Sequence, residues 1–215
     1  TKKDLAIGAI KFQPKIDVTA RKFDPKYGML AVSLADSGGL LYPTDVKSLA
    51  PRETRRLVAP ATGSGYVVGA LRDIKAPTSG PGADELSAIM IPTNQTTPFE
   101  FLEIPAAPKI VGHSLVLDPP AASVAAVTPA ATYATLSQVD TRLAGSTKLD
   151  VKIPIWDVYA SGWATSLDLP EMPAQAKGSY RWEVLFGGAS SGATVQLGPN
   201  LVEGLSHVSK SATDL

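Results

Sequence analysis

Hydrophobic and polar residues alternate with a period of two in two stretches of this chain. In residues 148–159, four aliphatic side chains alternate with lysine, aspartate and proline: Leu149, Val151, Ile153 and Ile155. In residues 180–186, every second residue is aromatic or aliphatic. Successive side chains of a β-strand point to opposite faces. Each pattern therefore predicts a strand with its apolar face on a core and its polar face in water.

Two further runs, residues 86–91 and 109–117, are apolar on both faces, which is typical of central strands in a sandwich or of strands at an interface. Weaker strand patterns cover residues 29–34, 66–74, 98–104, 193–197 and 201–208. Together these are about nine strands, at a spacing that indicates an all-β sandwich or barrel.

Proline and glycine, 18 of each, leave little room for long helices. Residues 44–58 are predicted to form two short helical turns, separated at Ala50 and Pro51. The Ala-, Pro-, Thr- and Ser-rich residues 119–136 predict a long surface loop, with a short helix at 132–139. Residues 187–192 are expected to form a turn or flexible loop, and the polar residues 209–215 to fray. The predicted fold is an antiparallel β-sandwich with short helical turns in its loops.

Composition excludes several classes of function. Twenty basic and 20 acidic residues give a net charge of zero, which argues against a nucleic-acid-binding domain held by charge over its whole surface. The chain has no cysteine and only two histidines, so no metal site and no cofactor are expected. No apolar run reaches the roughly 18 residues of a membrane span, so no membrane contact is expected either.

The candidate catalytic motifs all have an ordinary structural alternative. Asp36-Ser37-Gly38 resembles the catalytic loop of aspartic proteases, but a second such loop is missing and the same residues form common turns. A homodimer could supply two copies of this loop. Adjacent His113 and Ser114 would point to opposite faces of a strand, so we expect a histidine packed within that strand.

Three weaker motifs point to no chemistry. His207 has no acidic residue or histidine at the spacing of metal ligands and is predicted to be exposed. Residues 63–65 lack the Gly-Lys-Ser/Thr ending of a phosphate-binding loop. Residues 94–96 match a glycosylation sequon, a short motif that often occurs by chance. We therefore expect no catalytic residue and no enzyme.

Basic residues cluster in two places. Residues 1–26 hold seven basic and three acidic side chains, which favours either polyanion binding or a solvated surface. The candidate nucleic-acid-binding residues are Lys2, Lys3, Lys11, Lys15, Arg21 and Lys22. The second cluster is Arg52, Arg55 and Arg56, which would bind a polyanion or pair with acidic groups of a neighbouring subunit. In a helical turn, Arg52 and Arg56 would share a face.

Five aromatic residues suggest a sugar-stacking platform: Trp156, Trp163, Trp182, Tyr159 and Tyr180. Trp182 lies on the apolar face of its predicted strand and should belong to the core. Trp156 interrupts the alternation that precedes it and could face outward. A carbohydrate-binding or adhesive β-sandwich module is thus one candidate function.

The Cys-free β pattern, the proline-studded loops, the Ala/Thr/Ser-rich stretch and the basic N-terminal residues resemble the shell domain of coat proteins of small non-enveloped icosahedral viruses. The resemblance implies a jelly roll of about eight strands. It divides the chain into a basic arm at 1–26, a shell domain at 27–208 and a tail at 209–215. The family's long Arg/Lys-rich arm is reduced here to a few lysines.

The function that this resemblance implies is a capsid protein. Copies of the chain would assemble into an icosahedral shell around genomic nucleic acid, for which RNA is expected, and the protein would be located in the virion. The binding module would instead be a monomer with Trp156 or Trp163 exposed, and a hydrolase would depend on Asp36.

Overall fold

Antiparallel β-strands make up nearly all the regular structure in the computed structural model of the chain, which describes residues 15–37, 40–59, 65–94, 99–121, 127–170, 178–190 and 204–215. The strands are β1 (Lys15–Thr19), β2 (Tyr27–Ser37), β3 (Leu40–Leu49), β4 (Thr54–Val58), β5 (Gly65–Asp73), β6 (Leu86–Pro92), β7 (Lys109–Val111), β8 (Ser114–Val116), β9 (Val127–Ala144), β10 (Thr147–Ser161), β11 (Ser166–Asp168), β12 (Ser179–Ser190) and β13 (His207–Asp214). A 3₁₀ turn, η1 (Pro81–Ala83), precedes β6. The all-β antiparallel prediction is confirmed.

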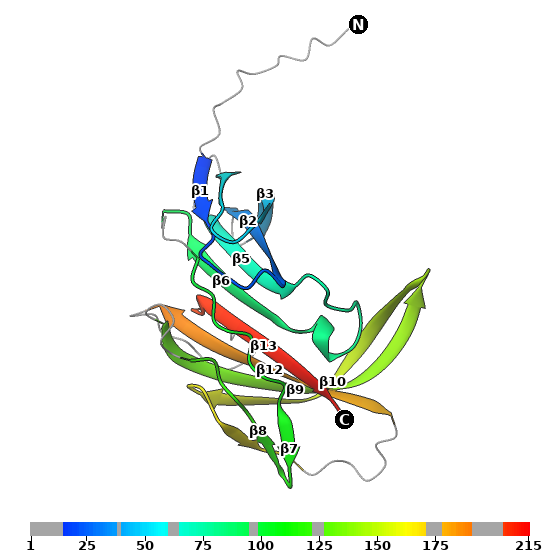
Figure 1. Cartoon of the computed structure of the whole chain (residues 1–215). Coiled ribbons are helices and arrows are strands. Elements are labelled where there is room, and N and C mark those ends of the chain that lie inside the picture. Colours follow the sequence, from blue (N-terminus) through cyan, green and yellow to red (C-terminus); the bar gives the residue numbers. More distant parts are fainter. Residues whose placement is uncertain are drawn as a thin grey trace, which may run out of the picture.

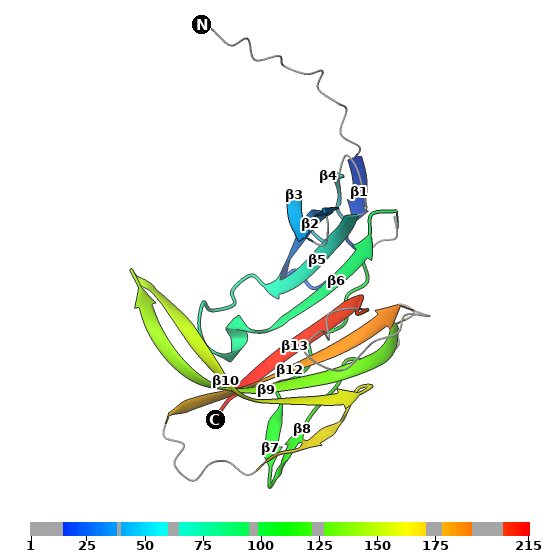
Figure 2. The same ribbon diagram turned by 180° about the vertical axis from the view of Figure 1, so that it is seen from behind.

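Eight strands form one hydrogen-bonded sheet in the order β10-β9-β12-β13-β6-β5-β2-β3. Two small sheets, β1-β4 and β11-β8-β7, complete the fold. They lie at opposite ends of the molecule, and the β9–β10 hairpin projects to one side (Figures 1 and 2). The large sheet is open, so β10 and β3 are its two edge strands.

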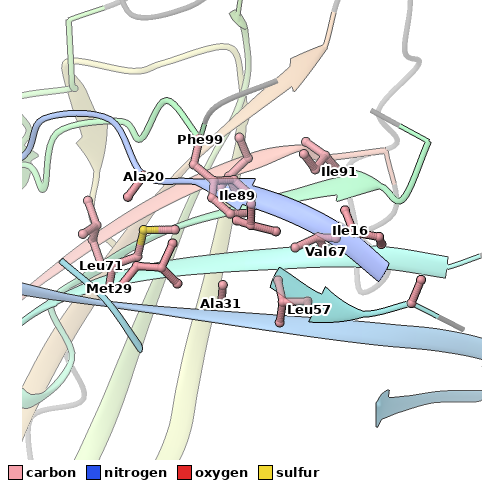
Figure 3. Packing of buried hydrophobic residues seen from close by; sticks show 13 residues of the cluster. Ile16, Ala20, Met29, Ala31, Leu57, Val67, Leu71, Ile89, Ile91 and Phe99 are labelled. Carbon is pink, nitrogen blue, oxygen red and sulfur yellow. The ribbon is translucent and has the colours of Figure 1, made fainter. Parts of the chain in front are cut away.

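Two hydrophobic cores share one face of the large sheet. The first lies under β1 and β4, where Ile16 and Leu57 pack against Met29, Val67 and Ile89 of the large sheet (Figure 3). The second core lies under β7, β8 and β11 and is built around the following side chains: Leu115, Leu136, Leu167, Trp182, Val184 and Phe186. Residues directly opposite each other in a sheet lie on the same face. His207 of β13 lies opposite Ile89, which belongs to the first core, and opposite Gly188 of β12, which shares its face with Trp182 and Phe186 of the second core. Both cores are therefore on the same face. We call this face the inner face.

A polar strip separates the two cores along β13. Ser209 and Ser211 are buried there, and their hydroxyls donate to the carbonyls of Glu103 (2.6 Å) and Ala106 (3.0 Å). Residues 103–106 thus run along the inner face of β13. The prediction that residues 209–215 fray is wrong, because each buried serine finds an acceptor in a segment a hundred residues away in sequence.

Several local predictions are corrected by long-range pairing. Residues 44–58 are strands, not helical turns: β3 pairs with β2 and β4 with β1, and Arg52, with φ of 63°, lies in the turn between β3 and β4. The expected loop and helix within 119–139 are replaced by β9, whose Ala134 and Leu136 point into the second core. The single strand predicted at 109–117, central or at an interface, is instead the β7–β8 hairpin, which turns at Gly112.

The remaining predictions agree with the structure only in part. Residues 98–104 form no strand in their described part, although Phe99 makes an isolated bridge with Ala20. The last predicted strand, 201–208, overlaps β13 only at His207 and Val208, and residues 193–197 lie outside the described ranges. The expected N-terminal arm at 1–26 includes β1, whose Ile16 and Val18 are buried in the first core, so that part of it belongs to the folded body.

Candidate functional site

The edge strand β10 exposes a row of apolar side chains. Leu149, Val151, Ile153 and Ile155 are between 38% and 56% exposed. The prediction that this apolar face packs on a core is therefore wrong. Leu149, Val151 and Ile153 do lie on the inner face, but the second core packs against Trp156, Val158 and Ala160 further along the strand. The hairpin carries the earlier residues beyond the small covering sheet.

A β-bulge explains the behaviour of Trp156. The register between β10 and β9 shifts between Pro154 and Trp156, so odd-numbered residues face inward before it and even-numbered residues after it. Trp156 is half-buried against the second core, opposite Leu136. The expectation that Trp156 faces outward is therefore wrong.

The opposite edge of the sheet is also apolar. Leu40, Leu41, Tyr42 and Val46 of β3 are exposed, with Leu30 beside them on β2. Of the 15 exposed large hydrophobic residues in the described part of the chain, five lie on β2–β3 and five on β9–β10. Ten of them therefore gather at the two ends of one sheet. Open strand edges with apolar side chains are typical of surfaces that pair with another chain.

A buried ion-pair network lies behind β10, on the outer face of the sheet. Nη1 of Arg181 donates to Asp150 (2.6 Å) and to Asp84 (3.0 Å), and its Nε donates to Asp214 (2.6 Å). Lys152 donates to Asp84 (2.5 Å) and to Glu183 (2.9 Å). The polar face of β10, predicted to lie in water, is therefore turned toward β12 and η1.

The network has clear electrostatic effects on its carboxylates. Burial alone would raise the pKa of Asp150, but hydrogen bonds from the Gly80 N–H and from Arg181 outweigh it and leave the pKa lowered. The pKa of Glu183 is lowered in the same way, against its burial, by hydrogen bonds from Lys210 and Lys152. Both carboxylates are therefore held in the charged form, which fixes β10 to β12 and to the turn before β6.

The predicted basic sites are only partly brought together. Lys15, Arg21 and Lys22 are exposed on and after β1, and Arg21 forms an ion pair with Glu100. Lys2, Lys3 and Lys11 lie outside the described residues.

The three predicted interface arginines do not form one basic face. Arg55 and Arg56 are neighbours on β4, so their side chains point to opposite faces of the strand. The expectation that Arg52 and Arg56 share one face of a helical turn is therefore wrong. Arg55 pairs with Glu53 (2.6 Å) and Arg56 with Asp17 (2.8 Å). The hydrogen bond from Arg56 also lowers the pKa of Asp17.

A cavity of about 650 Å³ lies beside residues 21–27 and 99–104. Phe23, Tyr27 and Phe101 line it together with three basic and three acidic side chains. No sequence signal pointed to this cavity, because the two segments that line most of it, residues 21–27 and 99–104, are more than 70 residues apart along the chain.

The tryptophans form no exposed platform. Trp182 and Tyr180 are buried in the second core, as expected for Trp182. Trp163 is half-buried there and donates from Nε1 to the Gly187 carbonyl (2.9 Å). Tyr159 stacks on Tyr133 with ring centroids 4.7 Å apart.

The candidate catalytic motifs are also dispersed. Asp36 and Ser37 end β2 next to the connection to β3, and Gly38 lies outside the described residues. His113 lies in the β7–β8 turn and not within a strand, while Ser114 donates to Asp168 (3.4 Å).

The glycine motifs and the sequon agree only in part with their predictions. Residues 187–190 belong to β12, so the turn expected at 187–192 is wrong for these four residues. Residues 191–192, 63–64 and 95–96 lie outside the described ranges. Within the described ranges, no group of three His, Asp or Glu side chains could hold a metal ion, and no helix is long and apolar enough to cross a membrane.

His207, predicted to be exposed, is buried, and its Nδ1 lies 2.8 Å from the Ser206 hydroxyl. Burial lowers the pKa of His207 below its ordinary 6.5, and a hydrogen bond with the Glu100 backbone only partly opposes this. The unfolded chain therefore binds a proton before the folded chain does as the pH falls. The contribution of His207 to the free energy of unfolding should be fully present above pH 6.5. Below pH 6.5 it should decrease, by at most about 1.4 kcal/mol per pH unit.

Urea unfolding between pH 7.5 and pH 5.5 tests this prediction. His207→Gln should remove most of the decrease, whereas His113→Gln, which changes the chain's other histidine, should keep it. An equal pH dependence in wild type and His207→Gln would contradict it.

Comparison with protein-family models, with curated proteins and with solved structures gave no match for this chain. The open sheet edges described above are therefore the feature from which its function is inferred.

Proposed function

We propose that the chain is a structural protein whose copies assemble into a closed shell, as virus coat proteins do. The observation that carries the proposal is the pair of open, apolar edges at the two ends of the large sheet. A chain with two adhesive edges can contact more than one neighbour, and repeated contacts of this kind close into symmetric assemblies.

Shell assembly is physically reasonable for these edges. Each edge offers unpaired backbone groups and five exposed apolar side chains. Pairing with another copy would give the backbone groups hydrogen-bond partners and would remove the apolar side chains from water. Each contact can be weak by itself, because closure makes many contacts act together. The zero net charge of the chain means that copies do not repel one another as a whole.

Nucleic acid is the proposed content of the shell, with RNA expected and the virion as location. The exposed Lys15 and Lys22, with Arg21 beside them, would face phosphates without reading base sequence, and Lys2, Lys3 and Lys11 would extend the same basic region. Arg21 would have to exchange its Glu100 partner for a phosphate. No catalytic role is proposed.

Size-exclusion chromatography with light scattering tests the proposal directly. The purified chain, of 22.4 kDa, should elute as megadalton particles, and a 260 nm absorbance excess should decrease in high salt if the basic residues contact phosphate. A monomer at all salt and protein concentrations would overturn the proposal. It would favour the alternative of a monomeric β-sandwich binding module, for which the aromatic-lined cavity by Tyr27 and Phe101, not the tryptophans, would be the site to examine.

A further inference from the structure

The exposed part of β10 has a self-complementary sequence. Around Val151, an acidic residue precedes and a basic residue follows, and an aliphatic residue stands beyond each: Leu149, Asp150, Val151, Lys152 and Ile153. The aliphatic residues share one face of the strand and the charged residues share the other. Read in the opposite direction, the pattern keeps its apolar positions and exchanges its charges.

Antiparallel pairing uses this symmetry. If Val151 lies opposite Val151 of a second copy, Asp150 lies opposite Lys152 of that copy, and Leu149 lies opposite its Ile153. Opposite charges and aliphatic pairs at directly opposite positions stabilise an antiparallel ladder, and like charges destabilise it. A parallel arrangement in the same register would instead place each Asp150 beside another Asp150.

We propose that two copies of the chain associate through antiparallel pairing of β10 with β10, with Val151 on the twofold axis. This inference deepens the proposed self-assembly and rests on it, since it identifies the first contact of the assembly. The two large sheets then become one continuous sheet across the axis. The occupant of this edge is a second copy because the apolar positions of the strand match themselves in the antiparallel direction and no like charges meet across the axis.

The structure also sets the limits of the pairing. Pro154 has no N–H to donate, so it ends the row of donors, and in this register it lies opposite Lys148. The ladder therefore spans residues 148–154 of each copy. The row of exposed aliphatic side chains coincides with this span and continues only to Ile155.

The ion-pair network prepares β10 for this contact. Asp150 accepts from the Gly80 N–H (2.7 Å) and from Arg181 (2.6 Å), which holds the strand in place before a partner arrives. Less order is then lost on association, which favours binding.

The other edge offers a poorer version of the same pattern. On β3, Asp45, Val46 and Lys47 repeat the order acid, valine, base, but a register shift at Thr44 makes Pro43 and the polar Ser48 the next residues on the face of Val46. The carboxylate of Asp45 is also bound locally, to the N–H of Val58 (3.0 Å) and of Val46 (2.8 Å). Fewer apolar contacts would form there, so we assign the twofold contact to β10.

Single cysteines test this contact cleanly, because the chain has no cysteine of its own. Val151→Cys should form a disulfide-linked dimer under mild oxidation, seen on a non-reducing gel. The matched control is Val116→Cys on β8, since Val116 and Val151 are 40% and 39% exposed. Facing thiols have a millimolar effective concentration, so at micromolar protein the Val151→Cys dimer should form roughly a hundredfold faster than the control dimer.

Other outcomes would overturn the inference. Equal rates for Val151→Cys and Val116→Cys would show that β10 does not meet β10. A disulfide that forms only when Val151→Cys is mixed with Val46→Cys would replace the twofold with head-to-tail pairing of β10 and β3.

Light scattering of Val151→Lys separates this inference from the proposed function. This variant places two like charges on the axis and should lose the dimer while keeping the wild-type circular dichroism spectrum. If its particles form as in the wild type, self-assembly stands and the β10 contact is wrong. If the wild type stops at a dimer that Val151→Lys abolishes, the β10 contact stands and the shell is wrong.

Discussion

Replacement of Arg181 with methionine is expected to lower the free energy of unfolding by about 3–5 kcal/mol. The Arg181 side chain is 3% exposed and contacts three carboxylates, of which Asp84 and Asp150 are themselves largely buried. Methionine would fill much of the volume but would leave the Asp150 carboxylate without its cation and would leave Asp84 with Lys152 alone at short range. Urea unfolding followed by circular dichroism measures the loss.

The matched control for Arg181→Met is Arg142→Met, because both arginines donate from Nε to an aspartate. The Arg142–Asp140 pair is exposed on both sides, so its loss should cost less than about 1 kcal/mol. Equal effects of the two substitutions would mean that the network contributes nothing beyond a surface ion pair.

The sign of the pH dependence follows from the lowered pKa of Asp150, because Arg181 is one of the groups that lower it. The stability that this carboxylate provides is present above its unfolded pKa and is lost as the pH falls through the folded one. The difference between wild type and Arg181→Met should therefore shrink below about pH 4.

Trp182→Ala should lower the free energy of unfolding by a similar amount, about 3–5 kcal/mol, through loss of packing. Trp182 is 1% exposed and lies at the centre of the second core, between Leu136 of β9 and Thr213 of β13 in the strand register. Alanine would leave a cavity that the two neighbouring strands cannot close, because their backbones are fixed by the ladder. The urea midpoint, with the slope of the transition, measures the effect.

Leu143→Ala is the control for this substitution, since Leu143 is 72% exposed near the end of β9. Its effect should stay within about 0.5 kcal/mol. A Trp182→Ala variant as stable as the control would mean that the second core does not contribute to folding.

The sequence alone predicts those elements whose two faces differ in a local, readable way. The apolar faces of residues 86–91 predict a central strand or a strand at an interface, and the structure places β6 between β5 and β13. The alternation in residues 180–186 likewise identifies β12 and its core-facing Trp182. In both cases the signal lies within a few consecutive residues.

Long-range pairing decided the elements that the sequence misidentified. Ser209 and Ser211 look like a solvated tail until a distant segment supplies their acceptors. Residues 44–58 favour turns locally, but ladders with β2 and β1 make them strands. Such partners cannot be found from a single stretch of chain.

The exposed part of β10 shows most clearly what the sequence determines and what the tertiary structure decides. The sequence by itself determined that residues 148–159 form a strand with one apolar face and that the pattern around Val151 is self-complementary. Only the tertiary structure decided that β10 lies at an edge, that its charged face meets Arg181, and that its apolar face stays exposed. The physical reason is that alternation separates two faces but does not specify which face other parts of the chain will cover.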